Sequence, residues 1–98
     1  MKVDISGLSK FFENRIRLGI MSILIVNDSY DFNSLKSALG VTDGNLASHL
    51  RSLEEGGLVR ANKKFIGKKP NTSYSATAAG EKLFRTHLKA LEQLLRKQ

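Results

Sequence analysis

The sequence contains no cysteine, which excludes disulfide bonds, zinc sites built on thiolates and cysteine nucleophiles. It also lacks a long apolar run. The longest one near the N-terminus covers residues 23–26, whereas a membrane span needs ~18–20 apolar residues. No signal-peptide pattern opens the chain, and we therefore expect a cytoplasmic protein.

Acidic residues are few: nine Asp and Glu stand against sixteen Lys and Arg, giving a formal net charge of +7 and a pI near 10.0. Residues 60–69 hold five basic residues and no acid, namely Arg60, Lys63, Lys64, Lys68 and Lys69. This run predicts a surface that binds phosphates, although a solvated hairpin carrying lysines would look the same. The 98-residue length and the 41% hydrophobic content predict one folded domain over residues 1–98.

The N-terminal third predicts an apolar helix. Ser9 or Ser6 can cap it, and it should run to about Val26, where Asn27 and Asp28 follow. One face of this helix is expected to carry Phe12, Ile16, Ile20 and Ile23. Other apolar residues lie on both sides of that face, so the helix should have more than one packing partner.

The middle of the chain predicts a short strand followed by a short helix. Aromatics alternate in residues 30–32, which favours a strand of minimal length. Asn33 is expected to cap a helix over residues 34–39, and Gly40 to close that helix in the left-handed conformation.

A second helix of this central pair should begin after its cap, Thr42, and run to about Glu55, before Gly56 and Gly57. Its inward residues have the spacing i, i+4, i+7 and are Leu46, Leu50 and Leu53. Its other faces carry short polar residues and one arginine, namely Asn45, Ser48, Arg51 and Ser52. Such side chains can approach base edges without steric obstruction, whereas an ordinary solvent face would more often be rich in Glu and Lys.

After the two glycines, residues 58–66 and 72–76 predict two strands joined by a turn over residues 67–71. The only proline of the chain, Pro70, should stiffen this turn. A basic tip on a two-stranded ribbon after a pair of helices is the arrangement called a wing.

The last helix is expected to begin after Thr77 and to run through about Arg96, roughly 30 Å. Its apolar arc contains Leu83, Phe84, Leu88, Leu91, Leu94 and Leu95, with His87 inside it. A helix this long should overhang a small domain, so its leucines should either fold back on the first helix or meet a second subunit.

These segments together resemble the winged helix-turn-helix domains of MarR- and ArsR-like transcriptional regulators, in particular the small stand-alone winged helix DNA-binding domain proteins. The matching pieces are Arg15-x-x-x-Gly19-Ile20, Phe32-Asn33-x-Leu35, Leu39-Gly40-Val41-Thr42, Asn45-Leu46-x-x-His49-Leu50-x-x-Leu53-Glu54-x-x-Gly57-Leu58-Val59, Lys64-x-x-Gly67-Lys68-Lys69-Pro70-x-Thr72 and Ser75-Ala76-Thr77-x-x-Gly80. The predicted fold is therefore mainly α with a small β wing, in the order α-β-α-α-β-β-α, with long N- and C-terminal helices for dimerisation.

The resemblance implies a homodimeric regulator, acting as a repressor, that binds an inverted repeat in double-stranded DNA. The helix-turn-helix would occupy about residues 34–55, the wing about 58–76 and the C-terminal dimerisation helix about 77–97. The expected DNA contacts of the recognition helix are Thr42, Asp43, Asn45, Ser48, His49, Arg51 and Ser52, and those of the wing are Lys63, Lys64, Lys68 and Lys69. The expected dimer interface contains Phe11, Phe12, Phe84, Leu88, Leu91 and Leu95.

The sequence departs from two groups of these relatives. Metal-sensing relatives use cysteines or clusters of His, Asp and Glu, whereas this chain has only His49 and His87, expected on different helices. We therefore predict no metal site and no cofactor. His49 is expected to pack beside its helix and bond backbone or a phosphate, with a direct base contact as the alternative. The chain offers little length for an effector pocket, so the sequence leaves a small-molecule effector unknown.

Three other functions are possible for a small basic domain. An enzyme would need convergent titratable groups, and no such motif is present. A winged helix can also serve only as a protein–protein interaction module within a larger assembly, in which case exposed apolar residues should replace the polar helix face and the lysine-rich wing. Double-stranded RNA is disfavoured because its deep, narrow major groove excludes a reading helix.

Overall fold

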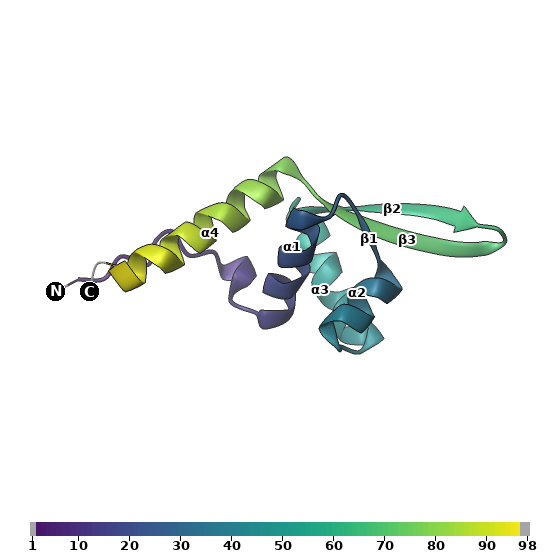
Figure 1. Cartoon of the computed structure of the whole chain (residues 1–98), viewed down its shortest axis with the longest axis horizontal. Helices are drawn as coiled ribbons and strands as arrows, with labels where there is room; N and C mark the ends of the chain where they lie inside the picture. The colour runs from purple at the N-terminus through teal and green to yellow at the C-terminus, as the bar shows by residue number, and fades with distance from the viewer. Residues whose placement is uncertain (1, 97–98) are drawn as a thin grey trace.

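The computed structural model describes residues 2–96, and within them helices pack against the base of a small antiparallel sheet whose hairpin projects outward (Figure 1). In chain order the elements are the 3₁₀ helix η1 (Lys10–Phe12), α1 (Arg15–Val26), β1 (Tyr30–Asp31), α2 (Phe32–Leu39), α3 (Asp43–Glu55), β2 (Val59–Ile66), β3 (Lys69–Ala76) and α4 (Ala78–Arg96). This order confirms the predicted mainly α fold with a β hairpin after the central helix pair. The predicted extension of the last helix to residue 97 lies outside the described residues.

The first long helix begins later than predicted. Ser9 caps only the short η1. α1 starts at Arg15, because the Asn14 Oδ1 accepts hydrogen bonds from two N–H groups of the first turn at 2.8 and 3.2 Å. The prediction of one continuous helix from Ser6 or Ser9 onward is therefore wrong. Asn14 gives the backbone a cap at a point where the apolar pattern alone suggested a helix interior.

The start of α2 also differs from the prediction, because Asp31 and not Asn33 is the cap. The Asp31 Oδ2 accepts a hydrogen bond from the Ser34 N–H at 3.4 Å, and hydrogen bonding from Ser34 holds the pKa of this carboxyl below its usual value. A carboxylate at this end of a helix is favoured by the helix dipole, which explains the earlier start. Gly40 closes α2 with a φ of 63°, as predicted.

The core lies where α1, α3 and the base of the hairpin meet. Leu46, Leu50 and Leu53 of α3 are buried, which confirms the inward positions predicted from their spacing. The remaining buried apolar residues come from η1, α1, α2, the start of β2 with the residue before it, and α4, and are Phe12, Ile20, Met21, Leu24, Leu35, Leu58, Val59 and Phe84. One contiguous core therefore fixes α3 against α1 and leaves the opposite side of α3 exposed.

Thr77 fixes the start of α4, as predicted. Its Oγ1 donates to the Gly57 carbonyl at 2.6 Å and accepts from the Gly80 N–H at 3.0 Å. Gly80 also lies against the backbone of Leu58, where an added Cβ would come within 2.0 Å of the carbonyl oxygen. A larger residue at this position would push α4 away from Leu58. Glycine at position 80 therefore allows the start of α4 to pack directly against the backbone before β2.

The sheet has the strand order β1-β3-β2 with all pairs antiparallel. β2 and β3 pair without interruption from Val59↔Ala76 to Ile66↔Lys69. The predicted turn over residues 67–71 is therefore too long, since only residues 67 and 68 form it, and Pro70 is part of β3. Its missing N–H is tolerated because this stretch of β3 lies beyond β1, which pairs only with residues 73 and 74.

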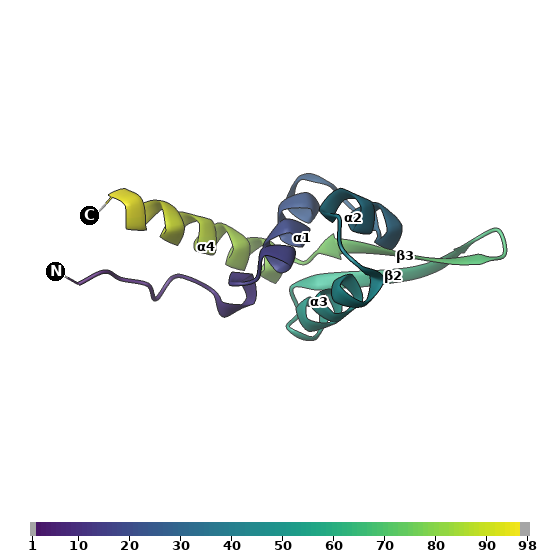
Figure 2. The same ribbon diagram turned by 90° about the horizontal axis from the view of Figure 1, so that it is seen from below.

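The molecule is elongated, with extents of 60 × 25 × 21 Å. Its radius of gyration is 15.0 Å, whereas a compact domain of this length has about 13 Å. The difference arises because the hairpin and α4 project from opposite sides of the helical core (Figure 1). Figure 2 shows the N-terminal segment running beside α4, so that both chain ends lie at the same end of the molecule.

Candidate nucleic-acid interface

α3 exposes a polar face opposite its buried leucines. Asn45, Ser48 and Arg51 are exposed, and their side chains have no hydrogen-bond or ion-pair partner among residues 2–96. Ser52, at the edge of this face, is half-buried. The face therefore presents donors and acceptors that no other part of the described protein engages, and groups of this kind can read base edges in a major groove.

Two residues predicted to touch DNA hold the start of α3 in place. The Thr42 Oγ1 accepts a hydrogen bond from the Asn45 N–H at 3.2 Å, which confirms the predicted cap. The Asp43 Oδ1 lies 2.8 Å from the Lys36 Nζ of α2. This exposed ion pair places a cation beside the one carboxylate in the first turn of α3.

His49 connects α3 to α1. The Arg17 Nε donates a hydrogen bond to the His49 Nδ1 at 3.0 Å. Burial, and secondly the charge of Arg17, lower the pKa of His49 below its usual value, which favours the neutral imidazole that this bond requires. His49 thus packs beside its helix as expected, but its partner is an arginine side chain. Arg17 was missed because 32 residues separate it from His49 and no local pattern links them.

Gly44 was also missed, although it lies on the exposed side of α3 in the first turn. A Cβ built on this glycine meets nothing within 4 Å, so the protein itself does not require a glycine here. Glycine inside a helix is destabilising by about 0.5–1 kcal/mol relative to alanine. A close approach of a partner to the helix backbone would explain why the smallest residue stands at this position.

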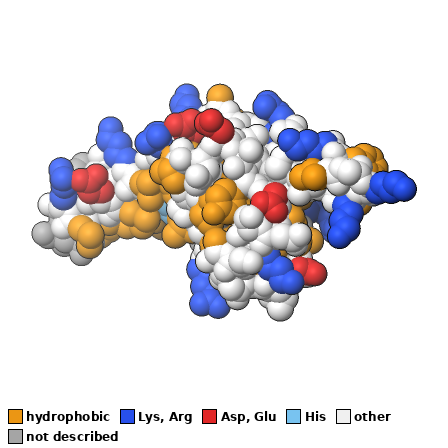
Figure 3. Space-filling model, turned by 45° about the vertical axis from the view of Figure 1, so that its right-hand side comes forward, with side chains coloured by type: hydrophobic (Ala, Val, Ile, Leu, Met, Phe, Trp, Pro, Cys, Tyr) orange, Lys and Arg blue, Asp and Glu red, His pale blue; other side chains and the backbone are white. Residues whose placement is uncertain are grey.

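The hairpin provides the cations. Residues 59–76 contain no acid, and their five basic residues, Arg60, Lys63, Lys64, Lys68 and Lys69, are all exposed. None of them forms an ion pair within the described part of the chain. Figure 3 shows Lys and Arg side chains gathered at this end of the molecule. The four lysines predicted to contact DNA therefore lie together around the distal half of the hairpin.

A second surface, at the opposite end of the molecule, is apolar. α4 exposes Leu88, Leu91 and Leu95, the last with 84% of its residue surface accessible. The adjacent N-terminal segment adds the exposed Val3 and Ile5. Hydrophobic side chains accordingly extend along this arm in Figure 3.

The three phenylalanines predicted at the dimer interface lie elsewhere. Phe12 and Phe84 are buried inside the single chain, with ring centroids 5.4 Å apart in an edge-to-face arrangement, and Phe11 is half-buried against the same core. His87 is buried beside Phe12, and its Nδ1 accepts a hydrogen bond from the Ser9 N–H at 2.9 Å. These aromatic side chains join the N-terminal segment to α4 within one chain and leave the leucines as the exposed apolar surface.

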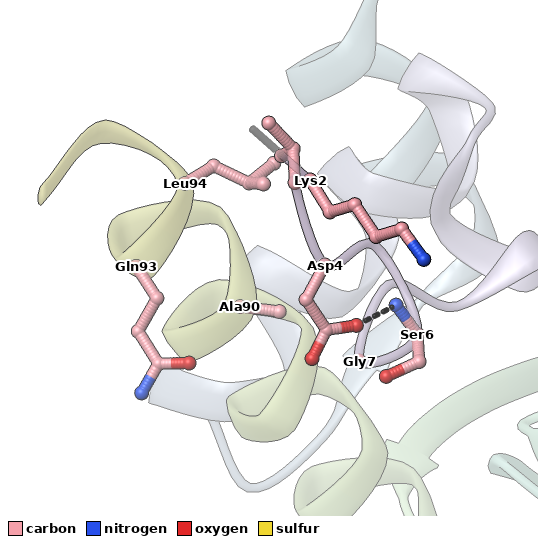
Figure 4. A pocket seen from close by; sticks show the side chains of 8 residues that line it. Lys2, Asp4, Ser6, Gly7, Ala90, Gln93 and Leu94 are labelled. Atoms are coloured by element: carbon pink, nitrogen blue, oxygen red, sulfur yellow. Dashed lines mark hydrogen bonds between the residues drawn. The ribbon is translucent and has the colours of Figure 1, made fainter. Parts of the chain in front are cut away.

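A groove of about 230 Å³ separates the N-terminal segment from the outer half of α4 (Figure 4). Val3, Ala90 and Leu94 give it apolar walls, and the Asp4 Oδ1 accepts a hydrogen bond from the Ser6 N–H at 2.9 Å. Gly7 lies close to Ala90, since a Cβ added to it would be 3.0 Å from the alanine Cβ. The groove is smaller than the roughly 300–1,000 Å³ of typical ligand pockets and forms a seam between two packed segments.

The described residues offer no metal-binding cluster, since no group of three or more His, Cys, Asp or Glu residues comes together within 2–96. No helix in the same range combines the length and apolar character needed to cross a membrane.

The chain is similar in sequence and structure to several known proteins. An uncharacterised protein of Methanocaldococcus jannaschii is 35% identical over 85 residues, which cover 87% of this chain and 92% of that protein. The structure of a transcriptional regulator homologue from Pyrococcus horikoshii OT3 shares 34% identity with a TM-score of 0.83, covering 91% of this chain and 88% of that one. The S. aureus MepR–DNA complex is 18% identical with a TM-score of 0.75, covering 93% and 74% of the respective chains, and shows the same fold.

The family assignment rests on most of the chain. Residues 16–95, which include both helices of the helix-turn-helix, the hairpin and nearly all of α4, match the winged helix DNA-binding domain family. The observed element order, the exposed polar face of α3 and the cationic hairpin agree with this match. The chain therefore belongs to the winged helix DNA-binding domain family.

Proposed function

We propose that the protein is a cytoplasmic, homodimeric transcriptional regulator that binds a specific inverted repeat in double-stranded DNA and represses by occupying it. The observation that supports this most strongly is the pairing of two surfaces. The exposed face of α3 has polar side chains without partners, and the neighbouring hairpin has five cations and no acid. The first surface can read bases and the second can neutralise phosphates.

In the proposed complex α3 enters the major groove with its N-terminal half closest to the bases. Gly44, Asn45 and Ser48 belong to that half, whereas Glu54 and Glu55 stand at the far end, where their charge is kept from the phosphates. The ion pair between Lys36 and Asp43 and the bond between Arg17 and His49 hold the helix in its orientation. Such fixed positioning is what recognition of base edges requires.

The proposed dimer forms through the leucines of α4. Leu88, Leu91 and Leu95 are exposed in the protomer, and a two-fold axis would bring the same residues of two chains together. Two recognition helices related by such an axis can read half-sites one DNA turn apart, roughly 34–36 Å. The relatives support the DNA-binding part of the proposal, since one is described as a transcriptional regulator homologue and another of the same fold is complexed with DNA.

The first experiment is selection of bound fragments from a pool of random duplex DNA by the wild-type protein. Enrichment of a short inverted repeat is the expected result. Sequences enriched without symmetry would contradict the dimer, and the absence of any enrichment would contradict sequence-specific binding.

The second experiment assigns the reading surface. Asn45→Ala, Ser48→Ala and Arg51→Ala should each leave the fold intact, because all three side chains are exposed. Where the side chain reads a base, the loss should be about 1–3 kcal/mol of specific binding, with relaxed preference at one position of each half-site. Ser37→Ala, on the exposed side of α2, is the matched control for Ser48→Ala and should change nothing. Equal losses on specific and random DNA would exclude α3 as the reader.

One observation favours a second candidate, a winged helix that binds another protein. The tip of the hairpin exposes Phe65 and Ile66, which is the kind of residue expected on a protein-docking surface. A protein that enriches no duplex in the selection would favour this candidate.

A further inference from the structure

The end of the hairpin combines exposed apolar side chains with lysines. Phe65 has 72% and Ile66 64% of their surface accessible, and neither belongs to the core. Pro70, opposite Phe65 in the strand register, is exposed as well. A cluster of this kind at the outermost point of a projecting element indicates a contact surface, because nothing in the fold covers it.

The strand register defines the shape of this tip. Pairing continues to Phe65↔Pro70 and Ile66↔Lys69, so only Gly67 and Lys68 form the turn. Gly67 has a φ of 66°, which agrees with a tight two-residue turn whose first central residue is glycine. Directly paired residues share a face and successive residues alternate, so Phe65 and Pro70 lie on one face and Ile66 and Lys69 on the other. The result is a thin ribbon end, two strands about 4.8 Å apart, with an apolar group on each face.

The charge around the tip indicates the occupant. Lys63 and Lys64 precede the apolar residues and Lys68 and Lys69 follow them, while residues 59–76 contain no acid. Lys68 lies in the turn itself, so a cation and not an apolar side chain leads the tip. A tip built to enter a bilayer would lead with its apolar residues. The minor groove of duplex DNA fits the arrangement better, because two rows of phosphates border a channel roughly 6 Å wide with sugars and base edges inside.

We propose that the exposed Phe65 ring of the wing wedges against a base step in the minor groove next to the site of α3 and bends the duplex. The inference rests on the proposed DNA-binding function and adds a specific contact to it. Apolar side chains that enter the minor groove partly unstack base pairs and kink DNA by roughly 20–90°. Flexible pyrimidine–purine steps take such a kink most easily, so the wing would favour them at a fixed distance from each half-site.

A fluorescence experiment tests the contact directly, because the chain contains no tryptophan. In Phe65→Trp the single indole should lose emission and become protected from acrylamide when the duplex enriched by selection is added. Val26→Trp, at an exposed position at the end of α1, is the matched control and should remain accessible. An indole at position 65 that stays as accessible in the complex as in the free protein would overturn the proposal.

A bending experiment provides the second readout. Energy transfer between dyes at the two ends of the same duplex should report shortening by the wild-type protein and little shortening by Phe65→Ala. The variant should bind about tenfold more weakly, as expected for a lost stacking contact, with an unchanged salt dependence because no charge is removed. Circular dichroism should show an intact fold, since the ring is exposed.

The outcomes separate this proposal from the function on which it rests. Wild-type protein that binds no duplex would overturn both. If the wild-type protein and Phe65→Ala bind and bend the duplex equally, only the proposed wedge is overturned. Binding to vesicles of phosphatidylcholine and phosphatidylserine that is lost in Phe65→Ala, while DNA bending is unchanged, would assign the tip to a membrane surface instead.

Discussion

The two ends of the molecule both expose apolar side chains but differ in how their charges are arranged. On α4, Glu81 pairs with Arg85 and Glu92 with Arg96, so half of the basic residues of the helix have an acidic partner. On the hairpin, none of the five cations has an acidic partner within residues 2–96. Paired charges beside leucines suit a surface that meets a copy of itself, whereas unpaired cations beside Phe65 and Ile66 suit a polyanion. Exposed apolar residues therefore indicate a contact surface, and the charges around them indicate its partner.

The largest expected effect on DNA binding comes from removing the exposed leucines of α4. Leu91→Glu combined with Leu95→Glu should give a monomer with most of its helical circular dichroism, because both side chains are exposed in the protomer. Loss of the second half-site contact should weaken binding to the inverted repeat by at least about 100-fold. Light scattering and titration of the labelled repeat measure the two quantities.

The control for this variant is Thr86→Glu with Lys89→Gln, which changes the net charge by the same amount on the other side of α4. It should remain dimeric. A dimer that survives the two leucine substitutions would place the interface elsewhere in the molecule.

A smaller effect is expected at the hairpin end. Lys68→Ala with Lys69→Ala should weaken binding to every duplex alike, since phosphate contacts carry little sequence information. If each lysine neutralises one phosphate, the slope of log K against log salt should become shallower by about 1.8. Filter binding or anisotropy at several salt concentrations measures the slope, and an unchanged slope would exclude these lysines as phosphate contacts.

In α3, which lies between the two ends, one substitution should raise the stability of the protein and weaken its binding to DNA. Gly44→Ala should stabilise the free protein by about 0.5–1 kcal/mol, because the position has open space for a Cβ and alanine favours the helix. The same variant should weaken DNA binding, since the added methyl group would hold the backbone away from the groove. Urea unfolding and DNA titration test the two halves. Improved stability with unchanged binding would show that DNA does not approach this glycine closely.

The smallest expected effect concerns pH and the bond between Arg17 and His49. Folding lowers the pKa of His49 below its ordinary value of 6.5. Between the folded pKa and pH 6.5, the unfolded chain therefore binds more protons at His49 than the folded protein does. The contribution of His49 is therefore present above pH 6.5 and is lost as the pH falls from 6.5 toward the lower folded pKa. Thermal unfolding at pH 7.5 and 5.5 should show a slightly smaller loss of stability in His49→Gln than in the wild type, and equal losses would contradict the assignment.

The sequence predicts the centre of the fold best, because local interactions decide it. The leucine spacing of α3, the cap at Thr42 and the left-handed Gly40 involve neighbours within one or two helical turns. The errors arise where several local choices compete. Ser6, Ser9 and Asn14 can all cap a helix, and in the structure Asn14 caps α1 whereas Ser9 caps only η1.

Tertiary contacts explain the other differences. The polar residues at the start of β3 have a weak preference for strands, and pairing with β2 extends the strand to Lys69 in spite of it. Phe12 and Phe84 have the pattern of an interface, yet the N-terminal segment folds along α4 and buries them within one chain. Arg17 and Gly44 could be identified as site residues only once the helices were placed, because their roles depend on neighbours or space that the sequence does not reveal.

The mass of the complex with the selected inverted repeat tests the central claim most directly, since it depends on both ends of the molecule. Analytical ultracentrifugation should give two 10.9 kDa chains on one duplex and cooperative occupation of the two half-sites. A single chain on the full repeat, or no stable complex with any duplex, would contradict the account.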